Sequence, residues 1–372
     1  MRGSSGPKLM PSHFETFTLG LIEGFYGEPW SWEARAGYAL FLKTHGFRFY
    51  IYAPKADAHL RRRWCEDWPK EEADALLRLR HHYRDAGVLF GLGLTPYGLH
   101  DAFDEAGARA LDEKIRRLNV FELDLLAVLF DDVPSVTPVL ARTQCAIAHR
   151  AMQESNAQGF LFCPTYYSYD PLIERALGPR PERYLEEIGE TLEAKVQVFW
   201  TGERICSTGY PEPHLAEVAL KLKRKPYLWD NYPVNDGPRM SRHLHLRAFT
   251  GRRPHLNRTA AGLAANPMNQ AALSKIPLAT LSLALTRASH DPAAAFAEAA
   301  RSLCGETLAA ALTQDLALFH DQGLDAISPE RKAELIAKYE RFDHDCAREV
   351  VAWLKGDYEP DAQVVAEFSD YV

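Results

Sequence analysis

Two adjacent carboxylates, Asp131 and Asp132, directly follow the apolar run 125–130. A run of this length, bounded by turn residues, is typical of a strand buried on both faces. Because an ionised carboxylate is costly to bury without a partner, we expect both side chains at the mouth of this strand, where the chain enters a loop. We therefore place the candidate chemistry at this strand end.

Two interpretations of this pair are open from the residues alone. In the first, the Asp-Asp-x-Pro segment is a turn, and one carboxylate caps the following helix. In the second, the pair is catalytic, with one carboxylate kept ionised and the other protonated to serve as an acid. The rest of the chain must decide between them.

Other kinds of chemistry have little support. The histidines at 81–82 and at 243 and 245 lack carboxylate or cysteine companions at metal-ligand spacing, so we predict neither a metal nor a cofactor. There is no Gly-x-Ser-x-Gly motif, and the cysteines lack the local signature of a Cys-His enzyme. Acid and base catalysis by carboxylates is the chemistry that remains.

The composition excludes some classes of partner. The chain has 372 residues, of which 47% are hydrophobic and 25% charged, and a formal net charge of -7, so we expect no nucleic-acid partner. Since no apolar run reaches transmembrane length, we expect no membrane segment. Six widely spaced cysteines without a CxxC pair predict buried free thiols and a reducing, cytoplasmic compartment. The sequence leaves the oligomeric state open.

Apolar runs alternate with segments of helical spacing along most of the chain. The runs are 19–24, 49–53, 88–94, 125–130, 160–164, 196–200, 226–229 and 262–265. The expected helices are 31–44, 70–86, 101–119, 138–156, 181–191, 213–223 and, more weakly, 241–249. Eight strands alternating with helices over about 250 residues are typical of a (β/α)8 TIM barrel. A doubly wound sheet is the alternative, but no Gly-x-Gly-x-x-Gly follows the first strand.

We predict three parts in the chain. Residues 1–17 are interpreted as an expression leader or flexible N-terminus, because they begin with a Gly- and Ser-rich stretch without a signal-peptide core. Residues 18–288 are predicted to form the barrel. Residues 289–372 are predicted to form a C-terminal helical appendix, in which we find no candidate chemistry. Helical segments are expected after residue 267, at 271–288, 292–303, 308–321 and 329–354.

If the chain forms a barrel, its functional residues should lie at the carboxyl ends of the strands, because active sites in this fold are built there. The predicted strand ends are rich in aromatic, amide and acidic residues, as expected for a site that stacks rings on a sugar and binds its hydroxyls. They carry Glu23, Gly24, Tyr26, Lys55, Thr95, Tyr97, Asp131, Asp132, Tyr166, Tyr167, Thr201, Trp229, Asn231, Asn235, Asp236 and Asn266.

The adjacency of Asp131 and Asp132 restricts how they could act on a sugar. Neighbouring side chains at a strand end point in different directions, so these two do not readily face each other across one glycosidic bond. The pair is better suited to two different roles on one sugar. One acid would protonate the leaving oxygen while its neighbour binds a different part of the same sugar.

The chain resembles glycoside hydrolase family 84, the O-GlcNAcase-type β-N-acetylglucosaminidases, over roughly residues 19–285. The resemblance rests on motifs that occur in the same order. They are IEGFYGEPW at 22–30, YAPK at 52–55, FDDV at 130–133, CPT at 163–165, WTG at 200–202, WDN at 229–231 with ND at 235–236, and NP at 266–267.

The resemblance implies a retaining mechanism in which the acetamido oxygen of the substrate attacks C1 and gives an oxazoline, an exception to the scheme with two catalytic carboxylates. By similarity, Asp131 would orient the acetamido N–H, and Asp132 would be the general acid and later the base. Tyr167 would contact the acetamido group, and Trp229 would wall its pocket. The residues implied to bind or frame the sugar hydroxyls are Gly24, Lys55, Asn231, Asp236 and Asn266.

Two residues depart from the family pattern: Tyr166 stands where Glu or Gln is common, and Met268 breaks the usual Asn-Pro-Asn continuation. We expect both to affect the rim of the pocket. The amino-terminal domain common in bacterial members is also not expected, because the first strand begins near Leu19.

The leading hypothesis is an exo-acting β-N-acetylglucosaminidase that removes O-GlcNAc from Ser or Thr of proteins. Its partners would be β-linked N-acetylglucosamine glycosides or O-GlcNAc-modified proteins. A broader hexosaminidase acting on glycan or chitin-type ends is one alternative. A catalytically silent sugar-binding module is another, and the presence of all the implied site residues argues against it.

Overall fold

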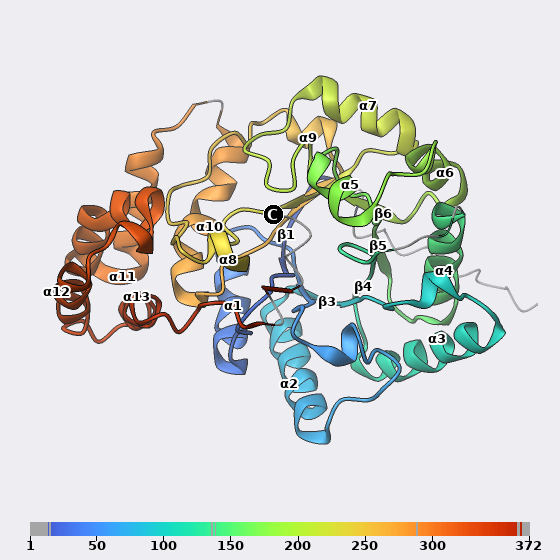
Figure 1. Ribbon diagram of the computed structural model, residues 1–372, viewed down its shortest axis with the longest axis horizontal. Helices are drawn as coiled ribbons and strands as arrows, with labels where there is room; N and C mark the ends of the chain where they lie inside the picture. Colours follow the sequence, from blue (N-terminus) through green and yellow to red (C-terminus); the bar gives the residue numbers. More distant parts are fainter. Residues whose placement is uncertain are drawn as a thin grey trace, which may run out of the picture.

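The computed structural model describes residues 14, 16–134, 137, 139–287, 289–362, 365 and 366. Within these residues, eight parallel strands close into a barrel in chain order (Figure 1). The strands are β1 (Thr18–Glu23), β2 (Phe49–Tyr52), β3 (Leu89–Leu94), β4 (Leu125–Leu129), β5 (Gly159–Cys163), β6 (Gln197–Trp200), β7 (Tyr227–Asp230) and β8 (Gly262–Ala265). The predicted (β/α)8 barrel is confirmed, and each strand matches an expected apolar run, with β1, β5 and β7 extending one residue beyond theirs. The expected leader lies largely outside the described residues.

Helices surround the barrel and extend beyond it on one side (Figure 1). They are α1 (Trp32–Thr44), α2 (Lys70–Ala86), α3 (Glu105–Leu118), α4 (Leu140–Glu154), α5 (Pro171–Leu177), α6 (Tyr184–Thr191), α7 (Glu212–Leu222), α8 (Gly237–Met240), α9 (Leu256–Thr259), α10 (Ala271–Thr286), α11 (Pro292–Ala317), α12 (Pro329–Tyr339) and α13 (Asp345–Lys355). The helix α5 was not predicted, because seven residues give too short a periodic pattern.

The interior of the barrel is filled by large rings opposite glycines. A Cβ on Gly20 would lie 2.1 Å from the ring of Phe49, and one on Gly262 would lie 2.3 Å from the ring of Tyr227. The Phe49 and Tyr227 rings lie 6.1 Å apart, and the Tyr227 hydroxyl donates to the carbonyl of Thr18 at 2.6 Å. These glycines therefore make room for the core that closes one end of the barrel.

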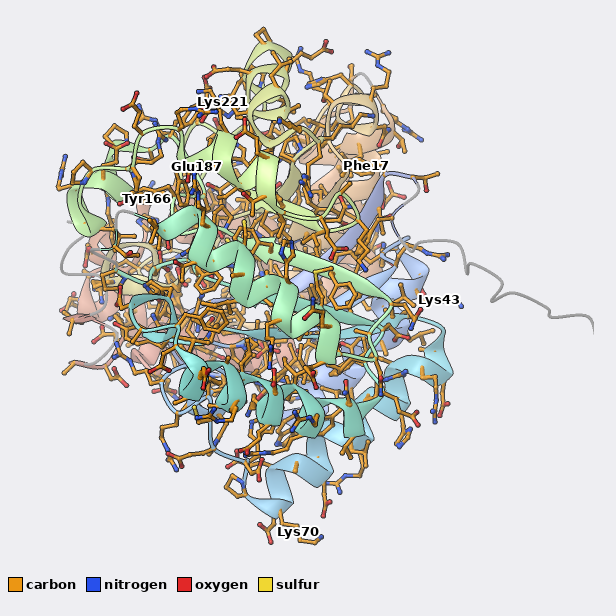
Figure 2. All side chains as sticks on the ribbon, turned by 90° about the vertical axis from the view of Figure 1, so that its right-hand side faces the viewer. Phe17, Lys43, Lys70, Tyr166, Glu187 and Lys221 are labelled. Atoms are coloured by element: carbon orange, nitrogen blue, oxygen red, sulfur yellow. The ribbon has the colours of Figure 1, made fainter. Side chains whose placement is uncertain are left out.

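The strands are paired so that their carboxyl ends meet at the opposite end of the barrel. Glu23 at the end of β1 lies beside Tyr52 at the end of β2, and Leu94 of β3 lies beside Val128 of β4. Residues that follow the strands are thereby brought together, although they are far apart in the sequence. The outer helices carry charged side chains such as Lys43 and Lys70 at the periphery of the molecule (Figure 2).

The helices α11, α12 and α13 form a lobe beside the barrel, next to α10 (Figure 1). Its apolar core includes Trp353 and Phe319 together with Leu244, Leu246 and Met268, which belong to segments near the barrel. The expected helices 292–303 and 308–321 lie within α11 and the π-helical turn that follows it at Leu318–Gln322, and α11 is broken at the non-helical residue Gly305, as their separation predicted. The expected single helix 329–354 is instead divided into α12 and α13. The boundary predicted at residue 288 lies outside the described residues and stays a prediction.

The predicted helix 241–249 is wrong. The segment is irregular and follows the short helix α8. Leu244, Leu246 and Ala248 are buried, whereas Arg247 is exposed, so the burial alternates with a period of two and not with that of a helix. The segment is held against the lobe by backbone bonds, such as the N–H of Leu244 to the carbonyl of Phe319 at 3.0 Å.

No helix among the described residues is long and apolar enough to cross a membrane. None of the six cysteines forms a disulfide, as predicted. Their predicted burial holds only in part. Cys145, Cys163 and Cys346 are buried, Cys304 is half-buried, and Cys65 and Cys206 are exposed.

Candidate active site

A cavity of about 850 Å³ opens at the carboxyl ends of the strands, within the size range of small-ligand pockets. All nine residues predicted for the site line this one cavity. They are Gly24, Lys55, Asp131, Asp132, Tyr167, Trp229, Asn231, Asp236 and Asn266. They lie near or after the carboxyl ends of β1, β2, β4, β5, β7 and β8, so the closed barrel is what brings them together.

Asp131 is buried and ion-paired with Lys55. The Lys55 ammonium, on the loop after β2, donates to Oδ2 of Asp131, and both side chains are largely shielded from solvent. Among the described residues, Oδ1 of Asp131 has no hydrogen-bond partner. Buried polar atoms normally have a hydrogen-bond partner. This carboxylate oxygen on the cavity wall can therefore accept a hydrogen bond from a bound ligand.

Asp132 is held differently from its neighbour. Its backbone is in the left-handed region, with φ of 57°, which is uncommon for a residue other than glycine and is often found at functional sites. Its Oδ1 accepts from the hydroxyl of Tyr167 at 2.7 Å, and its Oδ2 accepts from that of Tyr26 at 3.1 Å. The following helix, α4, has no side-chain cap, so the helix-cap interpretation of the pair is wrong.

A network of amide groups joins β1, β7 and β8 on another wall. Asn266 accepts from the N–H of Gly24 at 3.1 Å and donates to Oδ1 of Asn231 at 3.0 Å. The indole N–H of Trp229 donates to the same Asn231 oxygen at 3.0 Å. A Cβ on Gly24 would lie 2.5 Å from the Trp229 ring, so only glycine permits this close packing. The network fixes the face of the tryptophan that walls the cavity.

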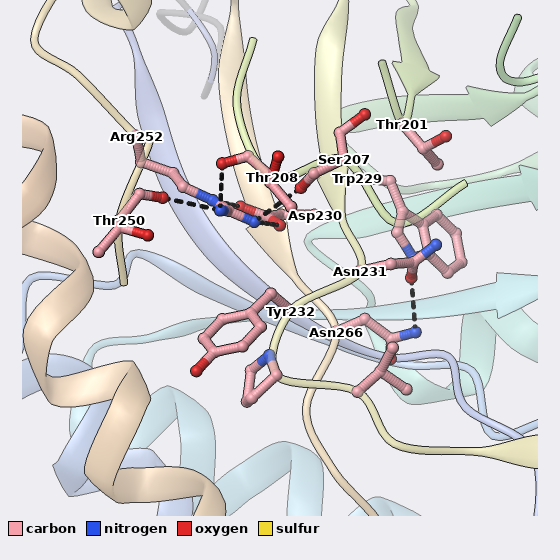
Figure 3. A network of polar contacts seen from close by, with 12 residues as sticks. Thr201, Ser207, Thr208, Trp229, Asp230, Asn231, Tyr232, Thr250, Arg252 and Asn266 are labelled. Carbon is pink, nitrogen blue, oxygen red and sulfur yellow. Dashed lines mark hydrogen bonds and ion pairs between the residues drawn. The ribbon is translucent and has the colours of Figure 1, made fainter. Parts of the chain in front are cut away.

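Successive side chains at the end of β7 point in opposite directions, so one side lines the cavity and the other anchors the strand (Figure 3). Trp229 and Asn231 lie on the side of Asn266, whereas Asp230 between them points the other way, to Arg252. The guanidinium of Arg252 donates to both carboxylate oxygens of Asp230, at 2.6 and 2.8 Å. Both side chains are buried. This pair therefore anchors the strand end that presents the cavity residues.

Asp236 lies on the loop after β7 and is buried at the cavity wall. Its Oδ2 accepts from the backbone N–H of Tyr26 at 2.8 Å. Burial raises the pKa of Asp236 to about 7, the charge of Asp132 raises it too, and the Tyr26 N–H and the Lys55 charge oppose this. Asp236 can therefore change its charge near neutral pH.

Tyr26 was not among the predicted site residues, although it lies in the motif at 22–30 and was noted at a strand end. Its hydroxyl contacts Asp132, its N–H contacts Asp236, and it lines the cavity. A tyrosine after a strand is common in any protein, so only the fold shows that Tyr26 joins two carboxylates.

The two departures from the family pattern lie away from the cavity, so their expected effect on its rim is not supported. The Tyr166 hydroxyl donates to the carbonyls of Gly178 and Pro179 at 3.0 and 3.2 Å. Met268 is fully buried in the core of the lobe, and its carbonyl accepts from the indole of Trp30 at 3.1 Å. Neither residue lines the cavity.

The structure brings together a possible ligand set that the sequence did not suggest. The ligand atoms of Cys304, His344 and Cys346 lie within 4.8 Å of one another in the lobe. Both ring nitrogens of His344 are already used, because Nδ1 accepts from the N–H of Cys346 and Nε2 lies 3.1 Å from the carbonyl of Leu303. This group does not present a ready metal site, and the cavity residues carry the chemistry.

The fold and cavity define a class of protein. A closed (β/α)8 barrel with two differently held carboxylates, an aromatic wall and amide groups at its strand ends has the architecture of a glycoside hydrolase.

The β-N-acetylglucosaminidase family pattern matches residues 19–318. The chain belongs to this family of glycoside hydrolases, which confirms the resemblance to family 84. It is 31% identical to the protein O-GlcNAcases of Rattus norvegicus and Mus musculus over 261 residues, which cover 68% of this chain and 28% of each relative. The chain thus spans little more than a quarter of the length of these curated relatives.

Solved structures agree with this assignment. An O-GlcNAc hydrolase of Thermobaculum terrenum, solved as a point variant, is 28% identical, with a TM-score of 0.74 over 91% of this chain and 80% of that one. A structure named CpGH84B is 24% identical, with a TM-score of 0.71 over 95% of this chain and 62% of that one, and supports the fold.

Proposed function

We propose that the protein is a retaining exo-β-N-acetylglucosaminidase that uses the acetamido group of its substrate as the nucleophile and removes O-GlcNAc from Ser or Thr of proteins. The observation that carries the proposal is the free, buried Oδ1 of Asp131 on the cavity wall, next in sequence to a carboxylate held by two tyrosines. An acetamido N–H would satisfy this oxygen and orient the carbonyl oxygen toward C1.

Lys55 and Asp131 act together in this scheme. The ammonium keeps one oxygen of Asp131 engaged, so the other oxygen accepts the acetamido N–H. As that N–H is polarised, the acetamido oxygen becomes a better nucleophile and bonds to C1, which gives the protonated oxazoline, whose N–H stays hydrogen-bonded to Asp131. Tyr167 and Trp229 wall the pocket for this group.

Asp132 supplies the proton in the first step and removes one in the second. The C1–O bond breaks as Asp132 protonates the leaving oxygen, and the aglycone departs as an alcohol. Asp132 then takes a proton from the water that attacks C1, which opens the oxazoline and restores the acetamido group. Gly24, Asn231 and Asn266 frame the sugar, and Asp236 is proposed to accept hydrogen bonds from its 4- and 6-hydroxyls.

The substrate and setting are also part of the proposal. The names of the mammalian and bacterial relatives favour O-GlcNAc-modified proteins over chitin-type chains. The absence of disulfides among the six thiols is consistent with a reducing, cytoplasmic location.

The test is the hydrolysis of an aryl β-N-acetylglucosaminide compared with the matching aryl β-glucoside. Cleavage of the acetamido sugar alone, with β-configured N-acetylglucosamine as the first product by NMR, is expected. Cleavage of neither compound would favour the silent sugar-binding module. Equal cleavage of both would contradict a role for the acetamido group.

A further inference from the structure

Three arginines line the outer part of the candidate cavity, and the proposed chemistry does not use them. Arg175 lies on α5, Arg204 lies on the loop between β6 and α7, and Arg239 lies on α8. All three are exposed to solvent, unlike Asp131 and Asp236, which lie on the inner wall. The segments after three successive strands thus each contribute one cation to the mouth.

The three arginines at this mouth have few ion-pair partners. Within the part of the chain that the structure describes, neither Arg175 nor Arg239 forms an ion pair, and Arg204 makes one at 3.7 Å with Asp170. The carboxylate of Asp170 already accepts from the N–H groups of Leu172 and Ile205, both at 3.1 Å. Since the whole chain has a net charge of -7, a cationic mouth is a local feature and not a reflection of composition.

The surface between these arginines does not resemble a site for a second sugar. The aromatic rings that line the cavity, Tyr26, Tyr167 and Trp229, contact the inner residues Asp132 and Asn231. The arginines are instead interspersed with aliphatic side chains. These include Leu172, Ile205, Pro238 and Met240. A further pyranose would need a ring to stack on, whereas a peptide can use mixed aliphatic and cationic contacts.

We propose that Arg175, Arg204 and Arg239 form an aglycone subsite that selects peptides with acidic groups beside the glycosylated Ser or Thr. The inference rests on the proposed function and goes beyond it by naming the substrate class. Arginine binds carboxylate and phosphate through paired N–H donors, so aspartate, glutamate and phosphoserine are the groups it would recognise. Because the arginines are exposed, the preference is expected to weaken as salt screens the charges.

The experiment compares kcat/KM for O-GlcNAc peptides of one length whose flanking residues are Asp and Glu, their neutral amides, or phosphoserine. The wild-type enzyme is expected to favour the acidic peptide over the neutral one by about 10-fold at low ionic strength, as three modest surface contacts would give. The triple variant Arg175→Gln, Arg204→Gln, Arg239→Gln is expected to lose this ratio. Arg78→Gln, an exposed arginine on α2 away from the cavity, is expected to keep it.

Each outcome of this experiment has a defined meaning. An acidic-to-neutral ratio near one in the wild type, or a ratio that survives in the triple variant, would overturn the subsite. N-acetylglucosamine linked to a uronic acid or to glucose is assayed beside the peptides, and a charge preference seen only with this pair would overturn the peptide subsite and assign the mouth to anionic polysaccharides. Stronger cleavage of the phosphoserine peptide than of the Asp and Glu peptide would support the subsite and define its preferred anion. Absence of turnover even on the aryl glycoside would overturn the proposed function itself, and this inference with it.

Discussion

Two neighbouring aspartates are placed in different surroundings by one short segment of chain. Asp131 pairs with a buried ammonium and keeps one oxygen free, whereas Asp132, in a left-handed conformation, receives two tyrosine hydroxyls. Consecutive residues normally point apart, and the turn at Asp132 brings both carboxylates to one cavity. Different surroundings are what separate roles on one sugar require.

Asp132→Asn is predicted to affect substrates according to their leaving groups. An alkyl or peptide glycoside needs protonation as its bond breaks, so its kcat/KM is expected to fall by about 100- to 10,000-fold. A dinitrophenyl glycoside leaves easily and is expected to lose much less in the first step. Steady-state kinetics on both substrates check this, and losses of equal size would remove Asp132 from the acid role.

Asp236 is predicted to make the stability of the protein depend on pH. Its folded pKa of about 7 lies above its ordinary value, so the native state binds a proton that the unfolded state has lost. Stability from this group is therefore fully present below about pH 4 and is lost as pH rises to 7, at about 1.4 kcal/mol per unit. Asp236→Asn should remove this slope, as measured by chemical unfolding at several pH values. An unchanged slope would contradict the assignment.

The sequence was sufficient to predict residues that line the inner cavity, but not all of their contacts. Strand-end position and family motifs identified Asp131, Lys55 and Asp236, because both signals are local in the chain. They did not identify Tyr26, whose two contacts cross 106 and 210 positions in sequence. The exposed arginines at the mouth of the cavity were also not predicted, since a surface arginine has no distinctive sequence pattern.

Among the secondary-structure elements, strands were easier to predict than the segments that follow them. A strand buried on both faces has a nearly continuous apolar sequence, and each of β1 to β8 matches such a run to within one residue at its start or end. The segment 241–249 was misread because Leu244 and Ala248 have the spacing of a helix face. Its backbone instead bonds to the lobe, a tertiary contact that no local pattern contains.

The strand β7 is predicted to depend on the ion pair behind it. Arg252→Met would leave Asp230 buried without its partner, which is expected to cost about 3 to 5 kcal/mol of unfolding free energy. The double variant Asp230→Asn, Arg252→Met should be less destabilised, because no unpaired charge is left. Urea unfolding measures both. Equal losses in the single and double variants would show that packing, and not charge, holds the strand.

Hydrogen bonds join the barrel and the lobe across the whole molecule. Glu349 of α13 accepts from the N–H groups of Ala272 and Leu273 at the start of α10, both at 2.8 Å. The indole of Trp353 donates to the carbonyl of Ser241 at 3.0 Å. The lobe therefore supports the segment after β7 that also carries Asp236, and we expect the two parts to unfold together.

Trp353→Ala tests this coupling. Loss of a fully buried tryptophan is expected to cost about 3 to 5 kcal/mol and to lower the midpoint of one shared transition. Leu220→Ala, at an 80% exposed position on α7, is the control and should change stability by less than about 0.5 kcal/mol. Thermal unfolding followed with both spectroscopy and residual activity is the measurement. A variant whose activity persists after the first of two transitions would show that the lobe unfolds separately.

In the mechanism that we propose, the acetamido group of the substrate is the nucleophile and Asp131 positions it. The measurement is kcat/KM for aryl glycosides whose N-acetyl group carries zero, one, two or three fluorines. Fluorine withdraws electron density from the carbonyl oxygen, so the rate is expected to fall with each fluorine added. Asp131→Asn is expected to lower the rate on the unfluorinated substrate by about 100-fold. Rates independent of fluorine number, together with a near-normal Asp131→Asn variant, would rule out this mechanism.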